Sequence, residues 1–272
     1  MSLAIIYEEM SVMIDEEWLQ QRLCERITGK FMRCSVYCRD LTTGQELVWN
    51  DGVMPSASLI KVPIMIEAFC QAQGGQFDFD GEFAVYDAVD GGSFYDLPAG
   101  TVVTGKDLVQ HMIVESDNTC ANMLMDVLGM DCINEKIQQL GLEHTFLKRK
   151  MMDYDAVTRG FQNLTTAADM GKLFQLLYEG RCLDRRSDEA MLDILRWQED
   201  NTIIPAQLPH PIRIDHKTGE LEGINHDCGI VYVPNKPFIL CLLAQGVSDE
   251  PQGLYDMSCL AKDIYDIMAV PR

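Results

Sequence analysis

One segment of the chain is apolar on every side of a helix and still contains a lysine. Residues 59–69 are almost all apolar, and Lys61 lies among them. A helix that is hydrophobic all round belongs in the interior of a large domain, and Pro63 is tolerated there because it falls in the opening turns. A charge is costly to bury without a partner. The segment therefore predicts a core helix over 58–72 with an unusual lysine near its start.

Ser58 and Lys61 are three residues apart, so on a helix they share one face about one turn from each other. A serine hydroxyl is a poor nucleophile unless a base accepts its proton, and a lysine does so only when desolvation or nearby cations lower its pKa. The buried helix supplies that desolvation. The pair predicts a nucleophile and its general base, and the structural alternative is a capping serine beside a surface lysine.

Two further tripeptides support the same chemistry. Ser-Asp-Asn at 116–118 falls at the break between two predicted helices, and Lys-Thr-Gly at 217–219 ends a predicted short strand. Their structural alternatives are helix capping and a plain glycine turn. Gly219 leaves the strand edge without a side chain, so a substrate backbone can approach it as an added strand. A second lysine at the same pocket would also help to keep Lys61 neutral.

In this order the three motifs are the signature of class A β-lactamases and penicillin-binding proteins. The chain resembles that family from about Phe31 to its C-terminal helix. The resemblance implies a serine acyl-hydrolase that forms a covalent acyl-serine intermediate with a β-lactam or a peptide-like amide or ester. It implies no cofactor and no metal, and its partner is a small-molecule or peptide-like acyl substrate.

The resemblance also implies a role for each residue of the second and third motifs. Ser116 would relay a proton and contact the substrate carboxylate, and Asn118 would bind the substrate amide and orient Lys61. Lys217 and Thr218 would bind the substrate carboxylate. The backbone N–H groups of Ser58 and Glu220 would form the oxyanion hole. We expect Asp117 to have a structural role, accepting backbone N–H bonds beside a turn.

The chain departs from the family in one loop. Class A β-lactamases carry a glutamate there that helps to position the deacylating water, and in the corresponding stretch at 147–153 Met151 stands in its place. A methionine cannot accept a proton. Asp153 and Asp155 are near enough in sequence to substitute through a reshaped loop. We expect acylation to survive this change and deacylation to be slow.

Two other functions remain compatible with the motifs. A non-turnover penicillin-binding module, acylated once to signal, shares all three. A serine-dependent glutaminase shares the Ser-x-x-Lys chemistry, although the Lys-Thr-Gly strand favours a substrate that bears a carboxylate. His216, beside the third motif, either lines the site or has a structural role.

The order of predicted elements is helix, strands, helices, strands, helix. This order predicts a sheet assembled from both chain ends with an inserted helical lobe. The resemblance implies an α/β (α+β) fold of the β-lactamase type, in which the sheet is antiparallel and covered by helices and the inserted lobe is all-helical. We expect a single domain over 1–272, with a sheet lobe at about 15–55 and 205–272 and a mostly helical lobe at 58–200. Residues 74–105, rich in Gly and Asp, are expected to be largely irregular.

Charge and composition exclude several classes of function. The 22 basic and 42 acidic side chains give a net charge of -20, which opposes binding to nucleic acid. No apolar run is long enough for a membrane span. Most of the ten cysteines lie in apolar stretches, which predicts buried thiols rather than disulfides. Residues 1–13 contain no base, so no signal peptide is predicted; the compartment is left open, although the family is usually exported.

Overall fold

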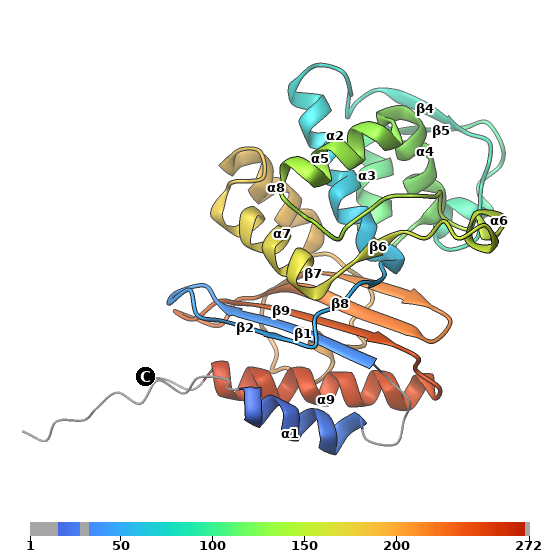
Figure 1. Cartoon of the computed structure of the whole chain (residues 1–272). Helices are drawn as coiled ribbons and strands as arrows, with labels where there is room; N and C mark the ends of the chain where they lie inside the picture. The colour runs from blue at the N-terminus through green and yellow to red at the C-terminus, as the bar shows by residue number, and fades with distance from the viewer. Residues whose placement is uncertain (1–15, 28–32, 270–272) are drawn as a thin grey trace, which may run out of the picture.

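A five-stranded antiparallel sheet divides the protein into layers. The computed structural model describes residues 16–27 and 33–269. In Figure 1 two helices, α1 (Glu16–Ile27) and α9 (Glu250–Met268), cover one face of the sheet, and a helical lobe lies on the other face. This arrangement confirms the predicted fold class, an antiparallel sheet covered by helices with an inserted helical lobe.

The sheet joins the two ends of the chain. Its strand order is β2-β1-β9-β8-β7, and every neighbouring pair is antiparallel. β9 is central and apolar over nearly its whole length, as expected for a strand covered on both faces. β7 is an edge strand. The five strands are β1 (Arg33–Asp40), β2 (Glu46–Trp49), β7 (Ile214–Leu221), β8 (Ile224–Val231) and β9 (Phe238–Gln245).

The helical lobe is built around α2 (Lys61–Gln73), whose first eight residues are all buried. A 3₁₀ turn, Ala57–Ile60, leads into it. The helix after residue 104 begins with a capping box, in which Thr104 and Asp107 bond each other's backbone N–H groups. The other helices are α3 (Gly105–Val114), α4 (Asn118–Leu128), α5 (Met130–Gln139), α6 (Tyr154–Thr158), α7 (Ala167–Glu179) and α8 (Arg185–Leu195), with short 3₁₀ helices at Ser93–Asp96 and Pro205–Gln207.

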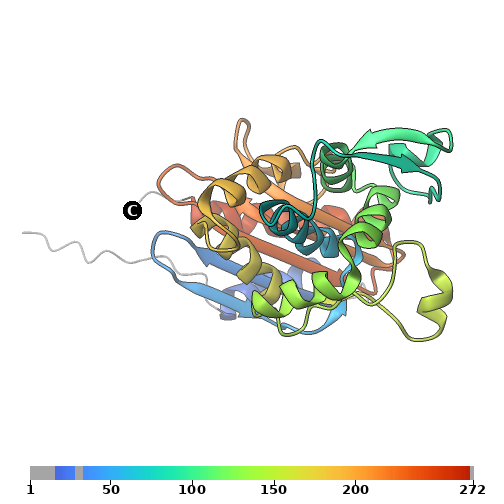
Figure 2. The ribbon, with the colours of Figure 1, turned by 90° about the horizontal axis from the view of Figure 1, so that it is seen from above.

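Several short elements were not expected from the sequence. Residues 74–105 contain a hairpin, β4 (Glu82–Val85) with β5 (Thr101–Thr104), and the minimal strands β3 (Met54–Pro55) and β6 (Leu164–Thr165) pair with each other. Figure 2 shows that the β4–β5 hairpin and the loop carrying α6 extend from the same end of the helical lobe. Strands of two to four residues carry too little periodicity to be recognised in a sequence.

The third motif does not end a strand, contrary to the prediction. β7 continues beyond Gly219 to Leu221, and β8 begins at Ile224. The two strands are joined by a two-residue turn in which Gly223 has φ +68°, a left-handed conformation that glycine adopts without strain. Phe31, where the resemblance begins, lies outside the described residues.

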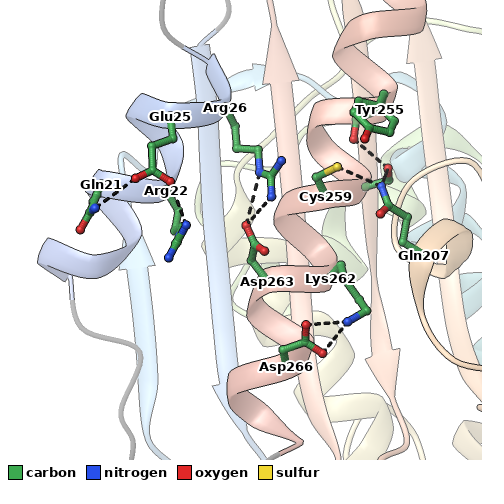
Figure 3. Close-up of polar contacts among 11 residues, drawn as sticks. Gln21, Arg22, Glu25, Arg26, Gln207, Tyr255, Cys259, Lys262, Asp263 and Asp266 are labelled. Atoms are coloured by element: carbon green, nitrogen blue, oxygen red, sulfur yellow. Dashed lines mark hydrogen bonds and ion pairs between the residues drawn. The ribbon is translucent and has the colours of Figure 1, made fainter.

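The two helices on the outer face of the sheet are held to each other by polar contacts as well as by their apolar faces. The Nε and Nη2 atoms of Arg26 on α1 donate to Asp263 Oδ2 on α9 at 3.3 and 2.9 Å (Figure 3). Leu19 and Leu23 of α1 pack in a core cluster with residues of β1, β9 and α9. The terminal helices therefore form one layer, although they are more than 200 residues apart.

The ten cysteines are free thiols, and seven of them are buried, which confirms the expectation that most are buried. None of the helices in the described part of the chain has both the length and the apolar character needed to cross a bilayer.

Gly171 allows α7 to lie close to the sheet. A Cβ at this position would overlap the ring of the buried Tyr37 on β1. In an exposed helix a Gly-to-Ala change stabilises by about 0.5–1 kcal/mol. Here overpacking costs about 1–3 kcal/mol, so Gly171→Ala should lower the free energy of unfolding in urea denaturation.

The matched control is the same change in a Tyr37→Leu background, which removes the ring. There Gly171→Ala should be neutral or stabilising. Equal destabilisation in both backgrounds would show that the Tyr37 ring is not the obstacle.

Candidate active site

Ser58 lies where the sheet meets the helical lobe, in the 3₁₀ turn that leads into α2. The preceding residue, Ala57, has φ +46°, an uncommon left-handed value for a residue with a side chain. Among the described residues, nothing is hydrogen-bonded to the Ser58 hydroxyl. Ser58 is half-buried and lines a cavity. Its hydroxyl is therefore accessible and free to donate a proton.

The segment before Ser58 is fixed by two long-range hydrogen bonds. The N–H of Ser56 donates to the carbonyl of Asn163 at 2.8 Å, next to the β3–β6 pair. On the other side, Nε2 of the buried His226 on β8 donates to the carbonyl of Pro55 at 2.8 Å. Desolvation lowers the pKa of His226 to about 4, so it is neutral near pH 7. These contacts hold the turn between the sheet and the lobe.

Lys61, the first residue of α2, has no exposed surface. Its Nζ donates to the carbonyl of Ser116, to Ser116 Oγ at 3.3 Å and to Asn118 Oδ1 at 2.8 Å. We expected Nζ to meet the Ser58 hydroxyl directly, but all three ammonium protons are directed to residues 116–118. An ammonium group has no lone pair. If Lys61 loses one proton, its Nζ gains a lone pair that can accept from the Ser58 hydroxyl, which has no other partner in the described part of the chain.

Lys217 on β7 also contacts Ser116. It too is fully buried, and its Nζ donates to Ser116 Oγ at 3.0 Å and to the carbonyl of Thr218 at 2.9 Å. Ser116 itself has φ +60°, again a left-handed value. The three motifs of the sequence thus meet at one point, where the Ser116 hydroxyl lies between two lysines.

Burial lowers the pKa of both lysines, and the charge of Lys217 lowers that of Lys61 further. Desolvation is the main cause that holds the pKa of Lys61 well below its usual range, and the charge of Lys217 adds to it. Desolvation likewise lowers the pKa of Lys217 to about 7, against the opposing attraction of Asp200 and Asp227. Lys61 is therefore available as a neutral base, whereas Lys217 is near its titration point at neutral pH.

The second motif is held to a backbone segment that forms the opposite wall. Asp117 caps α4 by accepting from Cys120 N and also accepts from Phe94 N, both at 2.8 Å, which confirms its structural role. Asn118 Nδ2 donates to the carbonyl of Asp90 at 2.8 Å. Side chains at Gly91 and Gly92 would overlap Asn118 and Asp117. The wall is therefore plain backbone at these two positions.

Gly219 brings the edge strand β7 against the turn that carries Ser58. A Cβ at Gly219 would lie 3.2 Å from Ser58 N and 3.2 Å from Ala57 Cβ, so only glycine allows this approach without displacement. Ser58 is the second residue of its 3₁₀ turn, where backbone N–H groups have no partner within the helix. Ser58 N and the neighbouring Glu220 are thus brought to the same edge of the cavity.

The cavity at this junction has a volume of about 490 Å³. Ser58, Ser116, Asn118, Thr218 and Glu220 line it, whereas the two lysines lie behind its surface. Four carboxylates contribute to the wall, and among them Glu115 is paired with His111 at 2.6 Å. The lining residues are Ser58, Gly91, Gly92, Val114, Glu115, Ser116, Asn118, Gln198, Glu199, Asp200, Thr218 and Glu220.

Met151 is buried and does not line this cavity. Asn122 on α4 holds its backbone, accepting from Met151 N at 2.7 Å and donating to Met151 O at 3.1 Å. The carboxylate of Asp153 caps α6 by accepting from Ala156 N at 2.9 Å. Asp155 is exposed, and neither aspartate lines the cavity with Ser58.

Sequence reasoning did not identify several residues that shape the site. His226 and Asn163 act through contacts to backbone groups that carry no motif, and three of the four wall carboxylates, Glu115, Glu199 and Asp200, come from two separate segments. The pair Gly91-Gly92 was the one detectable signal, since adjacent glycines suggest a close backbone approach. His216 does not line the cavity but lies buried next to Asp227. Among the described residues no cluster of His, Cys, Asp and Glu could hold a metal ion.

Comparison with known proteins gives a consistent result. The family described as "Beta-lactamase enzyme family" matches residues 19–268. The chain is 24% identical over 212 residues to beta-lactamase VEB-1 of Pseudomonas aeruginosa, covering 70% of this chain and 69% of that protein. The crystal structure of a beta-lactamase from Sphaerobacter thermophilus matches with a TM-score of 0.88 and 25% identity, covering 95% of this chain and all of that one.

A third relative is PBP-A. A mutant of PBP-A, solved as its acyl-enzyme complex with penicillin G, matches with a TM-score of 0.84 and 26% identity over 91% of this chain and 94% of that chain.

The lowered pKa of Lys217 makes a prediction for stability. Below pH 7 both folded and unfolded states carry the charge, and the folded state bears the full cost of a desolvated ammonium group. Between pH 7 and 10.5 the folded state releases this proton while the unfolded state keeps it, so stability rises with pH. Lys217→Met should therefore be more stable than the parent at pH 6, and the advantage should shrink by pH 9.

Urea denaturation at each pH measures the difference. The exposed Lys106, changed to methionine in the same way, serves as the control and should show no pH-dependent difference. A Lys217→Met difference that stays constant from pH 6 to 9 would mean that Lys217 keeps its proton throughout.

Proposed function

We propose, from the premise that this chain belongs to the beta-lactamase enzyme family and is a serine hydrolase, that Ser58 is its nucleophile and Lys61 the base. The observation that carries the proposal is the fully buried Lys61, with its pKa held low, one helical turn after a serine whose hydroxyl is free. A neutral amine in this position accepts the serine proton as the oxygen attacks.

The proposed reaction has two stages. Ser58 Oγ bonds to the carbonyl carbon of a β-lactam or a peptide-like amide or ester, and its proton passes to Lys61 Nζ. The bond to the leaving group breaks, and Ser116, which is hydrogen-bonded to both lysines, relays a proton to the departing atom. The N–H groups of Ser58 and Glu220 stabilise the oxyanion. Water then hydrolyses the acyl-serine.

The proposed substrate is anionic and peptide-like. Protonated Lys217, together with Thr218, would bind its carboxylate, and Asn118 its amide. β7 supports this assignment because it is the edge strand of the sheet, so an extended substrate can add alongside Gly219. The complex of the PBP-A mutant with penicillin G is a precedent for acylation within this fold.

We further propose that deacylation is slow. Met151 offers a thioether where a carboxylate would activate water, and the Asp153 carboxylate is occupied as a helix cap. A long-lived acyl-serine would also suit a penicillin-binding sensor, which makes the sensing module the second candidate. The wall carboxylates Glu115, Glu199, Asp200 and Glu220 are the groups that would act instead if turnover proves fast.

Benzylpenicillin should acylate the protein once, and the acyl group should then be hydrolysed slowly from the serine. Intact mass spectrometry should show one adduct within the first turnover, and peptide mapping should place it on Ser58. Opening of the β-lactam ring, followed by absorbance, should show a burst of about one equivalent and then a slow phase. Label on Ser56 or Ser116 contradicts the assignment of the nucleophile. Burst-free hydrolysis at about 10 per second or more, the ordinary enzyme range, contradicts slow deacylation.

Lys61→Ala should slow acylation of Ser58 by about two to four orders of magnitude, the usual contribution of a general base. Stopped-time mass spectrometry with benzylpenicillin measures the rate, and binding of an unreactive substrate analogue reports whether the cavity is intact. Acylation within about threefold of the parent, with normal analogue binding, would exclude Lys61 as the base.

A further inference from the structure

A buried histidine–aspartate pair lies directly behind the third motif. His216 is 2% exposed and Asp227 is fully buried, and His216 Nδ1 lies 2.8 Å from Asp227 Oδ1. The second carboxylate oxygen, Oδ2, accepts from the N–H of Ile204 at 2.9 Å. A carboxylate oxygen accepts hydrogen bonds, so in this pair His216 Nδ1 is the donor to Asp227 Oδ1. The proposed reaction uses neither side chain.

The strand register places Asp227 close to the substrate-binding end of β7. Asp227 on β8 is the direct partner of Thr218, and Cys228 is the partner of Lys217. Asp227 also holds the segment that follows Asp200 in the cavity wall, through its bond to Ile204. One buried carboxylate therefore contacts both structures that surround Lys217, the edge strand and the wall segment.

Among the described residues no carboxylate lies within bonding distance of Lys217, whose two hydrogen-bond acceptors are a hydroxyl and a carbonyl. The ionisable groups near it are Lys61 from α2, Asp200 from the wall segment, and Asp227 and the thiol of Cys228 from β8. Asp200 and Asp227 attract the charge of Lys217 and oppose the desolvation that lowers its pKa to about 7. Retention of the proton on Lys217 therefore depends on these two aspartates.

The two aspartates differ in their surroundings. Asp200 lines the cavity and is only half-buried, so water screens its charge, and a bound substrate carboxylate would be repelled by it. Asp227 lies behind the strand with no exposed surface, where screening is weaker and the substrate does not reach. Its charge acts on Lys217 without opposing the substrate.

We propose that Asp227, held in place by His216, is a positioning residue whose buried charge keeps Lys217 in the protonated form that captures the carboxylate of the substrate. The inference rests on the proposed function of this cavity. Without Asp227, the pH at which Lys217 loses its proton moves down, so a carboxylate-bearing substrate should be captured less well at pH 7–8. A substrate without a carboxylate should be unaffected.

The test compares two acylating probes across pH 5.5–9. Benzylpenicillin bears a carboxylate, and phenyl phenylacetate is an activated ester that carries the same phenylacetyl group and no carboxylate; the second-order rate of Ser58 acylation is followed by mass spectrometry. In the parent, the acylation rate should fall above about pH 7 with benzylpenicillin only; this fall is the limb that the variants are expected to move. Asp227→Asn should move that limb down by about one pH unit, a loss of about tenfold at pH 8. Its rates with the ester should match the parent's.

Asp188→Asn is the matched control. Asp188 is also a fully buried carboxylate that accepts two backbone N–H bonds, from Cys182 and Leu183, but it does not line the cavity. This variant should lose stability without moving the limb. If Asp227→Asn does not fold, His216→Ala, which removes the donor that orients Asp227, should shift the limb in the same direction.

Three results would overturn the inference. One is a limb that stays unshifted in the Asp227 or His216 variant, another is an acylation rate that falls equally with both probes at every pH, and the third is the same shift in Asp188→Asn. The first excludes an effect on Lys217, and the others indicate a merely structural role. Failure of the proposed function would look different, because then neither probe would acylate Ser58 in the parent protein.

Discussion

The burial of two lysines around one serine hydroxyl is the constraint on which the rest of this structure depends. Lys61 and Lys217 are both without exposed surface, and both donate to Ser116. Burial lowers the pKa of each ammonium group, and the charge of Lys217 lowers the pKa of Lys61 further. The proposed chemistry needs these shifts, because it uses Lys61 as a base and Lys217 to hold an anion.

The fold brings these groups together from distant parts of the chain. Lys61 comes from a core helix of the lobe, Ser116 from a left-handed residue between two helices, and Lys217 from the edge strand of the sheet. The 3₁₀ turn with Ser58 is held between them by the backbone contacts of Asn163 and His226. A site at the junction of two lobes is therefore sensitive to how the lobes pack, and the close approach at Gly219 sets that distance.

The cavity combines an anion-binding motif with an acidic wall. Three of its carboxylates, Glu199, Asp200 and Glu220, line the cavity of a protein with a net charge of -20. Capture of the proposed anionic substrate would then depend on Lys217 retaining its proton. Met151, which the sequence comparison with class A β-lactamases puts in place of the water-activating glutamate, is a buried thioether.

The sequence by itself determined the candidate reacting groups and the main layers of the fold. The apolar helix around Lys61, the alternation in the strands and the spacing of the motifs are local patterns, so Ser58, Lys61, Ser116 and Lys217 could be predicted to lie together without a structure, and the structure brings them to one junction. The tertiary structure alone decided that Lys61 bonds residues 116–118 rather than Ser58, that β7 extends past Gly219, and that His216 pairs with Asp227. These contacts join residues far apart in the chain, and their geometry and electrostatics arise only when the sheet and the lobe pack together.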